Sequence, residues 1–281
     1  SRLSTHLLLA DLQQAFLQVG LKEEDRDAFR FLFDINGKEE HFRFTRVPFG
    51  VEASPFMLGA TLQHHFHSQP EVYRKTVNSL AEDTYVDNLM KTGNDVEDLK
   101  QFKREAIEIL ESAKFPVHKW ESDIDELDEE SNPSKILGMK WDKRQDTLEI
   151  EAEPKNPEAP VTKRQILREL SSIYDPLGIV SPTMVEGKRV YREACHEKTG
   201  WNSEVSVSTS KDWLKWQQQL RNVKVPRSLA RGLRKVKAIQ LHLFADASFT
   251  ACSAVAIAVA EHAHSTGIMT SKPRGGMVTI P

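Results

Sequence analysis

The sequence predicts an α+β fold in the first half of the chain, then a helical region, and then the beginning of a further α/β unit. Short apolar runs that flank tight-turn signals predict the strands, and apolar residues at helical spacing predict the helices between them. The 281 residues are 39% hydrophobic and 28% charged, a composition typical of a globular protein with one large domain or two modest ones.

The first 70 residues alternate between strand and helix patterns. Residues 7–10 predict a buried strand that ends at Asp11. Two apolar runs on either side of Asn36-Gly37 predict a hairpin, because Asn-Gly tolerates the positive φ angles of a two-residue turn. Ser54 followed by Pro55 predicts a helix that begins with Ser54 as its N-cap.

Two short strands are then expected to meet at Asp87-Asn88, within the segment EDTYVDNLM at 82–90. Residues 95–113 predict an amphipathic helix, because their apolar residues recur on one face. The acidic stretch 121–130 predicts an exposed loop. Residues 136–141 and 147–150 predict a second hairpin.

The second half of the chain opens with a proline-rich linker at 154–160. Thr162 and Gln165 have the spacing of a capping box, which predicts a helix start, and Ser181-Pro182 predicts another. Strand patterns return from Ile239 to Asp246 and at 253–260. A third helix is expected to carry three apolar residues on one face, namely Trp213, Trp216 and Leu220.

The charge and cysteine content narrow the function classes. A net charge of −3 argues against a dedicated nucleic-acid-binding domain, although an enzyme that grips nucleic acid in one cleft can be neutral overall. Two cysteines without disulfide or zinc spacing favour a reducing compartment, and no segment resembles a signal peptide or a membrane span. We therefore expect an intracellular, cytoplasmic protein. Residues 221–237 hold many Lys and Arg and no acid; they are either a phosphate-binding surface or a solubilising face.

Histidines at three neighbouring positions invite a metal-site interpretation. No Cys or carboxylate falls at ligand spacing from them, so the pattern favours a solvated helix face. The residues are His64, His65 and His67.

Asp11 and Asp87 each end an apolar run. A rigid sheet can hold catalytic carboxylates at such positions. Two-metal phosphoryl transfer needs carboxylates that converge on Mg²⁺, because hard cations prefer oxygen ligands. Either acid alone is more typical of a turn or cap residue, so the surrounding residues must decide.

Five segments, in the expected order, resemble the motifs of reverse transcriptases. Residues 11–16 (DLQQAF) resemble motif A, and residues 47–56 (VPFGVEASPF) resemble motif B, the turn and helix of the nucleotide pocket. Residues 85–88 (YVDN) stand where the family has Tyr-x-Asp-Asp. Residues 115–120 (FPVHKW) look like the end of motif D, and residues 136–139 (ILGM) like motif E, the primer grip.

Further segments resemble the polyprotein of Pao/BEL-type LTR retrotransposons. They are residues 25–27, 140–142, 162–164 and 172–178 (SIYDPLG). Residues 243–248 (LFADAS) then look like the opening strand of that polyprotein's RNase H domain. The resemblance covers nearly the whole chain.

The resemblance implies a reverse-transcriptase palm, an antiparallel sheet with flanking helices, together with part of the fingers at 1–120. It implies an acidic loop and the primer-grip hairpin at 121–153, a helical thumb or connection region at 154–237, and the truncated N-terminal part of an RNase H-like domain at 238–281. The basic finger residues of the family would lie upstream of this fragment. Asp246 would be the only RNase H acid present, so RNA cleavage is not expected from the fragment.

The resemblance also implies the site. Asp11 and Asp87 would bind two Mg²⁺ ions, and Phe16 would be the steric gate that excludes a ribose 2′-hydroxyl. Phe49 and Gly50 would shape the nucleotide pocket. The partners would be an RNA/DNA primer-template, dNTPs and the other parts of the polyprotein.

Two further positions are implied less directly: Tyr85 would pack near the primer terminus, and Lys119 would lie near the leaving group. On the residues alone, Phe16 and Tyr85 can equally be core aromatics. Phe49-Gly50 can equally be only a turn before the next helix.

Asn88 departs from the family pattern, which has a second carboxylate there. Asn suits a tight turn, but its neutral amide is a poorer Mg²⁺ ligand. The loss of one negative charge beside two dications should cost about 4 kcal/mol of metal-assisted catalysis, which is roughly a thousandfold in rate. The sequence therefore predicts a catalytic site, with Asp11, Asp87 and Asn88, that is severely impaired.

Three function classes follow. The first is an RNA-directed DNA polymerase region, and the second is a catalytically dead remnant that at most binds primer-template. The third is an aspartic peptidase, since Pao-type polyproteins carry one. Peptidase chemistry is excluded for this chain because it has no Asp-Thr/Ser-Gly sequence to present a catalytic carboxylate.

Overall fold

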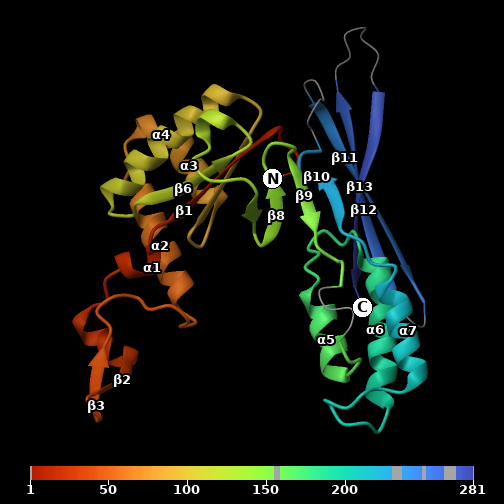
Figure 1. The fold of residues 1–281 in the computed structure, drawn as a ribbon. Helices are drawn as coiled ribbons and strands as arrows, with labels where there is room; N and C mark the ends of the chain where they lie inside the picture. The colour runs from red at the N-terminus through yellow and green to blue at the C-terminus, as the bar shows by residue number, and fades with distance from the viewer. Residues whose placement is uncertain (1, 155–158, 230–235, 249–250, 263–269, 281) are drawn as a thin grey trace. The chain divides into compact units, whose positions relative to one another are not determined.

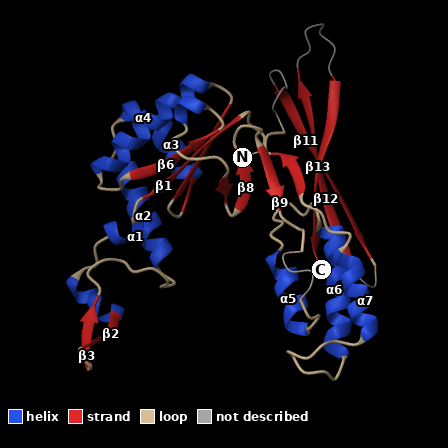
Figure 2. Cartoon of the chain, in the orientation of Figure 1, coloured by secondary structure: helices blue, strands red, loops and turns tan. Residues whose placement is uncertain are grey.

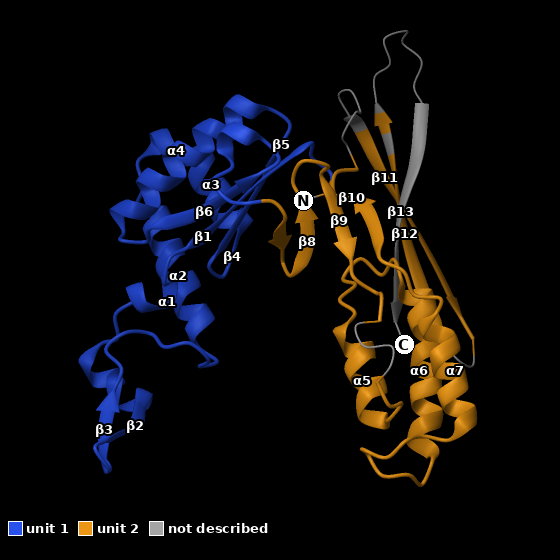
Figure 3. Ribbon diagram, viewed as in Figure 1, with its two compact units in different colours: residues 1, 3–131 blue, residues 2, 132–281 orange. Residues whose placement is uncertain are grey.

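The computed structural model describes residues 2–154, 159–229, 236–248, 251–262 and 270–280 (Figure 1). Helices and antiparallel sheets make up these residues, which confirms the α+β class (Figure 2). The chain divides into two compact units, residues 1 and 3–131 and residues 2 and 132–281 (Figure 3). No helix among the described residues is long and apolar enough to cross a membrane.

The first unit is built on an antiparallel sheet of four strands in the order β4-β5-β1-β6. These are β1 (His6–Leu12), β4 (Thr84–Tyr85), β5 (Asn88–Gly93) and β6 (Val117–Ser122). The helices of this unit are α1 (Ala15–Gln18), α2 (Ser54–His67), α3 (Arg74–Asp83) and α4 (Val96–Ser112), with short 3-10 turns at Glu23–Phe29, Glu71–Tyr73 and Asp125–Leu127. α3 was not predicted from the sequence.

One face of the sheet packs against the apolar core of this unit. Leu8, Ala10 and Leu12 of β1 are buried, and they alternate with Leu9 and Asp11, which are only partly buried. Because successive side chains of a strand point to opposite faces, Asp11 lies on the face away from this core. α4 covers the core with apolar residues at helical spacing. These residues are Leu99, Phe102, Ala106, Ile109 and Leu110.

The predicted helix at 95–113 is confirmed, with both ends defined by local chemistry. The side chain of Asp95 accepts a hydrogen bond from the backbone N–H of Asp98 at 3.0 Å, which caps the first turn. At the other end Lys114 has a φ of 65°, and the N–H of Phe115 donates to Leu110 at 3.0 Å. That bond closes the helix as a Schellman-type cap, with Lys114 in the place that glycine usually takes.

The hairpin around Asn36-Gly37 is also confirmed, as β2 (Arg30–Ile35) and β3 (Lys38–Arg43). Asn36 and Gly37 both have positive φ, 55° and 81°. The predicted cap of α2 is wrong. Ser54 is the first residue of the helix, and its hydroxyl donates to the carbonyl of Pro48 at 2.7 Å, so it holds the preceding turn instead.

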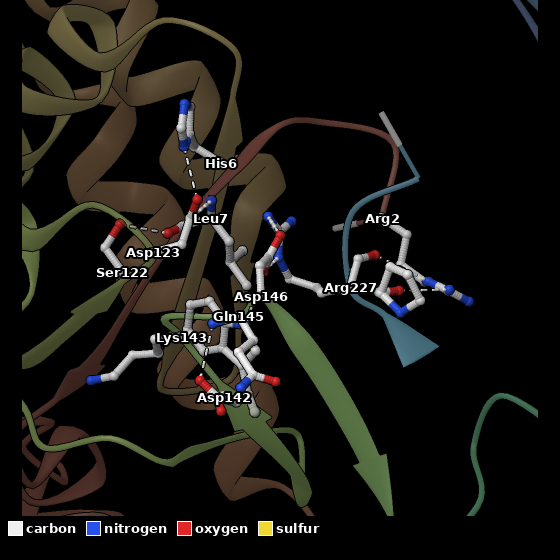
Figure 4. A network of polar contacts seen from close by, with 12 residues as sticks. Arg2, His6, Leu7, Ser122, Asp123, Asp142, Lys143, Gln145, Asp146 and Arg227 are labelled. Carbon is white, nitrogen blue, oxygen red and sulfur yellow. Dashed lines mark hydrogen bonds and ion pairs between the residues drawn. The ribbon is translucent and has the colours of Figure 1, made fainter. Parts of the chain in front are cut away.

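The acidic stretch 121–130 is not simply an exposed loop. Asp123 accepts hydrogen bonds from the backbone N–H of Leu7 and from the ring of His6, both at 2.8 Å (Figure 4). Leu127 is buried, and Asp128 accepts from the N–H of Ser122 at 3.1 Å. The acids therefore tie this segment to β1 and β6.

The second unit contains an antiparallel sheet in the order β10-β9-β8-β7. Its strands are β7 (Ser134–Ile136), β8 (Met139–Asp142), β9 (Thr147–Ile150) and β10 (Val223–Pro226). The sequence predicted one strand over 136–141, but the chain turns at Leu137-Gly138 and forms two strands there. The second predicted strand, 147–150, is confirmed.

A buried ion pair lies at the end of this sheet (Figure 4). The guanidinium of Arg227 bonds both carboxylate oxygens of Asp146, at 2.5 and 2.8 Å, and both side chains are at most 1% exposed. The indole N–H of Trp141 donates to the same carboxylate at 3.0 Å. Arg227 is therefore not available as part of a basic surface at 221–237, and residues 230–235 of that segment lie outside the described residues.

Three helices follow, as predicted: α5 (Lys163–Ser172), α6 (Ser181–His196) and α7 (Val207–Gln217). Thr162 caps α5 by accepting from the N–H of Gln165 at 3.1 Å. Trp213 and Trp216 of α7 are buried with ring centroids 4.6 Å apart, and Leu220 is buried just beyond the helix. The linker prediction at 154–160 falls mostly on residues outside the described ranges.

The last sheet has the strands β11 (Val236–Ala247), β12 (Cys252–His262) and β13 (Thr270–Ile280) in sequential antiparallel order. The strand patterns at 239–246 and 253–260 are confirmed. β13 was not predicted.

Candidate functional site

A row of four side chains crosses the first sheet, one from each strand. Tyr85 in β4 pairs with Asn88 in β5, Asn88 with Asp11 in β1, and Asp11 with His118 in β6. Directly paired residues in adjacent antiparallel strands place their side chains on the same face. The row therefore stands on the face of the sheet opposite the core.

Asp11 is the centre of this row, and its carboxylate is 32% exposed. The ring nitrogen Nε2 of His118 lies 2.9 Å from Oδ2 of Asp11. An ionised carboxylate can only accept, so the histidine donates in this contact. The Nζ atom of Lys119 lies 4.0 Å from the same oxygen. The side chains of His118 and Lys119 thus both lie near the same oxygen of this carboxylate.

Asp87 lies in the tight turn between β4 and β5, beside Asn88. Its backbone carbonyl accepts from the N–H of Leu12 at 2.8 Å, which places the turn next to the end of β1 where Asp11 lies. The amide nitrogen of Asn88 donates to Oδ1 of Asp87 at 2.8 Å. The two predicted carboxylates therefore lie at one end of two neighbouring strands.

Two residues at this site have strained backbones. Val86, in the turn, has a φ of 59°, and Lys119 has a φ of 52°. Positive φ is unusual for any residue with a side chain and is a clear outlier for a β-branched one. Such strain persists only where surrounding structure imposes it, and it is common at functional sites.

The aromatic residues of the predicted nucleotide pocket lie together. Phe16 is buried in α1, and its ring meets the ring of Phe49 edge-to-face at a centroid distance of 4.9 Å. Phe49 is 61% exposed. Gly50 has a φ of 81°, and a Cβ added to it would have no atom within 4 Å. Tyr85 is 68% exposed, so it is not a core aromatic.

The donors available to a metal ion are few. Among the described residues, no group of three or more His, Cys, Asp or Glu side chains could hold a metal. Asp11 and Asp87 offer carboxylate oxygens, which suit Mg²⁺ in kind. Asn88, next to Asp87, offers only a neutral amide oxygen.

Asp246 lies in the second unit, in β11 opposite Ser253 of β12. Its carboxylate accepts a hydrogen bond from the N–H of Ala247 at 2.9 Å and is exposed. It joins no metal-binding group in the described part of the chain.

His118 is the site residue that the sequence did not indicate. It lies in the segment 115–120 that resembles the end of motif D, but only Lys119 was given a role there, and His118 meets Asp11 only because β1 and β6 pair across 107 residues. Of the three helix histidines, His65 is half-buried and its Nε2 lies 2.7 Å from the carbonyl of Ile109, so it is not part of a solvated face.

Comparison with protein families gives two matches. Residues 1–140 match the model of the family described as reverse transcriptase (RNA-dependent DNA polymerase). Residues 162–279 match the family described as Pao retrotransposon-like RNaseH-like domain. A search of curated proteins found no match to the chain.

Proposed function

Since the chain belongs to the reverse transcriptase region of Pao-type retrotransposon polyproteins, we propose that its first unit is an RNA-directed DNA polymerase palm whose two-metal nucleotidyl transfer is impaired by Asn88. The observation that carries this proposal is the row Tyr85, Asn88, Asp11 and His118 on one open sheet face, with Asp87 in the adjoining turn. Its partners are an RNA/DNA primer-template and dNTPs.

The oxygen ligands at this site are of the kind that Mg²⁺ prefers, but only two of them are carboxylates. Asp11 and Asp87 would hold the metal through carboxylate oxygens, the ligands that hard cations prefer. When bound, a pair of Mg²⁺ ions supplies charge neutralisation at the leaving pyrophosphate and activation of the attacking hydroxyl. Asn88 can contribute only a neutral amide oxygen, and its amide nitrogen is engaged with Asp87.

The remaining residues of the site position the Asp11 carboxylate and the substrate. His118 holds one oxygen of Asp11 at 2.9 Å and so fixes the rotamer of that carboxylate. Lys119, 57% exposed and 4.0 Å from the same carboxylate, can reach a negatively charged leaving group on the open face. Asp246 is not assigned RNA cleavage, because a lone carboxylate does not make a two-metal site.

The pair Phe16 and Phe49 supports a nucleotide pocket. Phe16 is held by the edge-to-face contact with Phe49, so its ring has a fixed place beside the loop that carries Gly50. A fixed ring can exclude a ribose 2′-hydroxyl by its bulk. Tyr85, exposed at the end of the row, can contact the primer terminus.

Primer extension of a DNA primer on an RNA template tests the proposal. We compare the unaltered chain with Asn88→Asp, each with and without the upstream segment of its polyprotein. The added carboxylate should raise the rate roughly a thousandfold, because it restores about 4 kcal/mol of charge stabilisation. The matched control is Asp87→Asn with Asn88→Asp, which keeps the net charge of the unaltered chain and should be no faster than it.

Two results would count against this proposal in different ways. Equal rates for the unaltered chain and Asn88→Asp would show that Asn88 does not limit catalysis. Hybrid binding in EDTA without extension by any variant would favour a dead remnant that only binds primer-template.

A further inference from the structure

The turn between β7 and β8 has an unusual backbone. Leu137 and Gly138 both have positive φ, 46° and 89°. The left-handed region costs a residue with a side chain about 1–2 kcal/mol, and Leu has no polar group to offset it. Leu137 is also 56% exposed, so burial does not explain its place. The two-residue hairpin between Ile136 and Met139 calls for positive φ at both positions, so a contact from outside can offset the cost at Leu137.

Tyr174 supplies that contact. Its hydroxyl donates a hydrogen bond to the carbonyl of Leu137 at 2.8 Å. Its ring lies against Gly138, where an added Cβ would meet Cε1 of Tyr174 at 3.3 Å. Gly138 thus needs to be glycine for two reasons, its φ and the close ring. Tyr174, which is not part of the hairpin, therefore stabilises its turn.

The backbone that carries Tyr174 is itself fixed. Asp175, the next residue, accepts hydrogen bonds from the N–H groups of Ile179 and Val180 at 3.0 and 2.7 Å, just before α6 begins. Ile173, on the other side, packs against the apolar core of the three helices. The segment 172–178 therefore orders the backbone just before α6 and places Tyr174 against the hairpin.

A hollow of about 250 Å³ lies beside this contact. Its lining includes Tyr174, two lysines and two acids, namely Lys135, Lys140, Glu149 and Glu151. Lys140 is paired with Glu149 at 2.9 Å and with Glu151 at 3.6 Å. Lys135 is exposed and forms no ion pair with any residue in the described ranges. A free lysine beside an ordered turn suits a nucleic-acid phosphate, which such groups contact without reading sequence.

We propose that Tyr174 is a positioning residue for nucleic-acid binding: it holds the Leu137-Gly138 turn in the shape that contacts the backbone of the primer strand. This rests on the proposed function, which supplies the primer-template as the ligand. The helical segment is then coupled to the β7–β8 hairpin through one hydroxyl, within the second unit, and Lys135 provides the adjacent charge.

Binding of a fluorescent RNA/DNA primer-template in EDTA tests this without any catalysis. Tyr174→Phe removes only the hydroxyl and should weaken binding about fivefold, while Tyr174→Ala should weaken it about tenfold or more. Tyr191→Phe is the control, because Tyr191 lies in α6 and its hydroxyl interacts with Cys195. Thermal unfolding of each variant reports folding, and Tyr174→Phe should still unfold cooperatively, slightly below the unaltered chain, because one hydrogen bond of a residue that is 51% exposed is lost.

A double-mutant cycle separates positioning from general stabilisation. Asn accepts positive φ far better than Leu, so Leu137→Asn should hold the turn without help. In that background Tyr174→Phe should have less than half of its effect on affinity. An undiminished effect there, or hybrid binding by Tyr174→Phe as tight as by the unaltered chain, would overturn this inference alone. Failure of the unaltered chain to bind the hybrid would instead reject the proposed function.

Discussion

At the scale of residues, Asp87 and Asn88 are complementary in a way that two carboxylates are not. The amide of Asn88 donates to Asp87 at 2.8 Å, whereas a second carboxylate at this position would repel the first. The hairpin tip of this chain is therefore satisfied by its own hydrogen bond. A pair of acids there would depend on a cation for the same balance.

Phe16 offers a test of role at the same scale. Phe16→Val, made together with Asn88→Asp, should raise ribonucleotide use relative to deoxynucleotide use about 10- to 200-fold, because a single steric contact discriminates by about that much. The assay is primer extension with each nucleotide type. Phe66→Val is the control, since Phe66 is equally buried but lies in α2. Unchanged discrimination in the Phe16 variant, with lowered stability in both, would make Phe16 a core aromatic only.

At the scale of elements, the sequence predicted features that depend on neighbouring residues. It did not predict contacts between residues that are far apart in the chain. The Asn36-Gly37 turn and the Thr162 cap were predicted because each acts on its own neighbours. The place of Ser54 was not, because its hydroxyl binds Pro48 instead of its own helix.

The same distinction explains what was missed at the two candidate sites. His118 reaches Asp11 across 107 residues, and Tyr174 reaches the Leu137 carbonyl across 37. Neither contact has a local signature. Asp11 and Asp87 were predictable as site candidates because each visibly ends an apolar run; that they share a site is still a proposal.

Two helix glycines should respond to alanine with opposite signs. At Gly187 in α6 an added Cβ would lie 2.5 Å from Cζ2 of Trp216 and 2.8 Å from Leu170, so Gly187→Ala should destabilise by about 1–3 kcal/mol. At Gly59 in α2 nothing lies within 4 Å, so Gly59→Ala should stabilise by up to about 1 kcal/mol. Urea unfolding followed by tryptophan fluorescence measures both. Equal signs would contradict the packing of α6 on α7.

The start of α7 should make stability depend on pH. The pKa of Glu197 is lowered by hydrogen bonds from the hydroxyls of Thr209 and Ser206 and from the N–H of Ser206. A lowered pKa gives stability that is complete above the ordinary value of about 4.3 and is lost as the pH falls through the folded-state pKa.

Glu197→Gln should therefore be less stable by about 1–2 kcal/mol at neutral pH, because it weakens charge-assisted hydrogen bonds. The difference from the unaltered chain should shrink below about pH 4. Unfolding at pH 7, 5 and 3 measures this. A difference that stays constant over this range would show that the charge of Glu197 has no part in it.

At the scale of the whole molecule, a polar contact of a buried Asp side chain in each compact unit joins segments that are far apart in sequence. In the first unit Asp123 holds the start of β1, and in the second Asp146 holds Arg227 across 81 residues. Burying a charged side chain costs free energy unless an opposite charge compensates it. Removing one partner of a buried ion pair therefore destabilises the fold by the desolvation cost of the charge that remains.

Asp146→Ala should destabilise the second unit by about 3–5 kcal/mol, because it removes the carboxylate that binds the buried Arg227 guanidinium with two hydrogen bonds. Replacing both residues, as Asp146→Leu with Arg227→Met, should cost clearly less. Urea unfolding of the three chains gives the comparison. A double variant as unstable as Asp146→Ala would mean that the pair matters for its shape and not for its charge.

Cation binding by the polymerase unit is the most direct measure of whether Asp11 and Asp87 form one site that lacks an acid at position 88. Electron paramagnetic resonance of Mn²⁺ can count the ions bound by the unaltered chain, by Asn88→Asp, and by Asn88→Asp with Asp11→Asn. The added carboxylate should tighten Mn²⁺ binding about tenfold or more, since affinity at oxygen sites follows the number of charged ligands. Loss of Asp11 should abolish that gain. Equal affinity in all three chains would contradict a shared metal site at this end of the sheet.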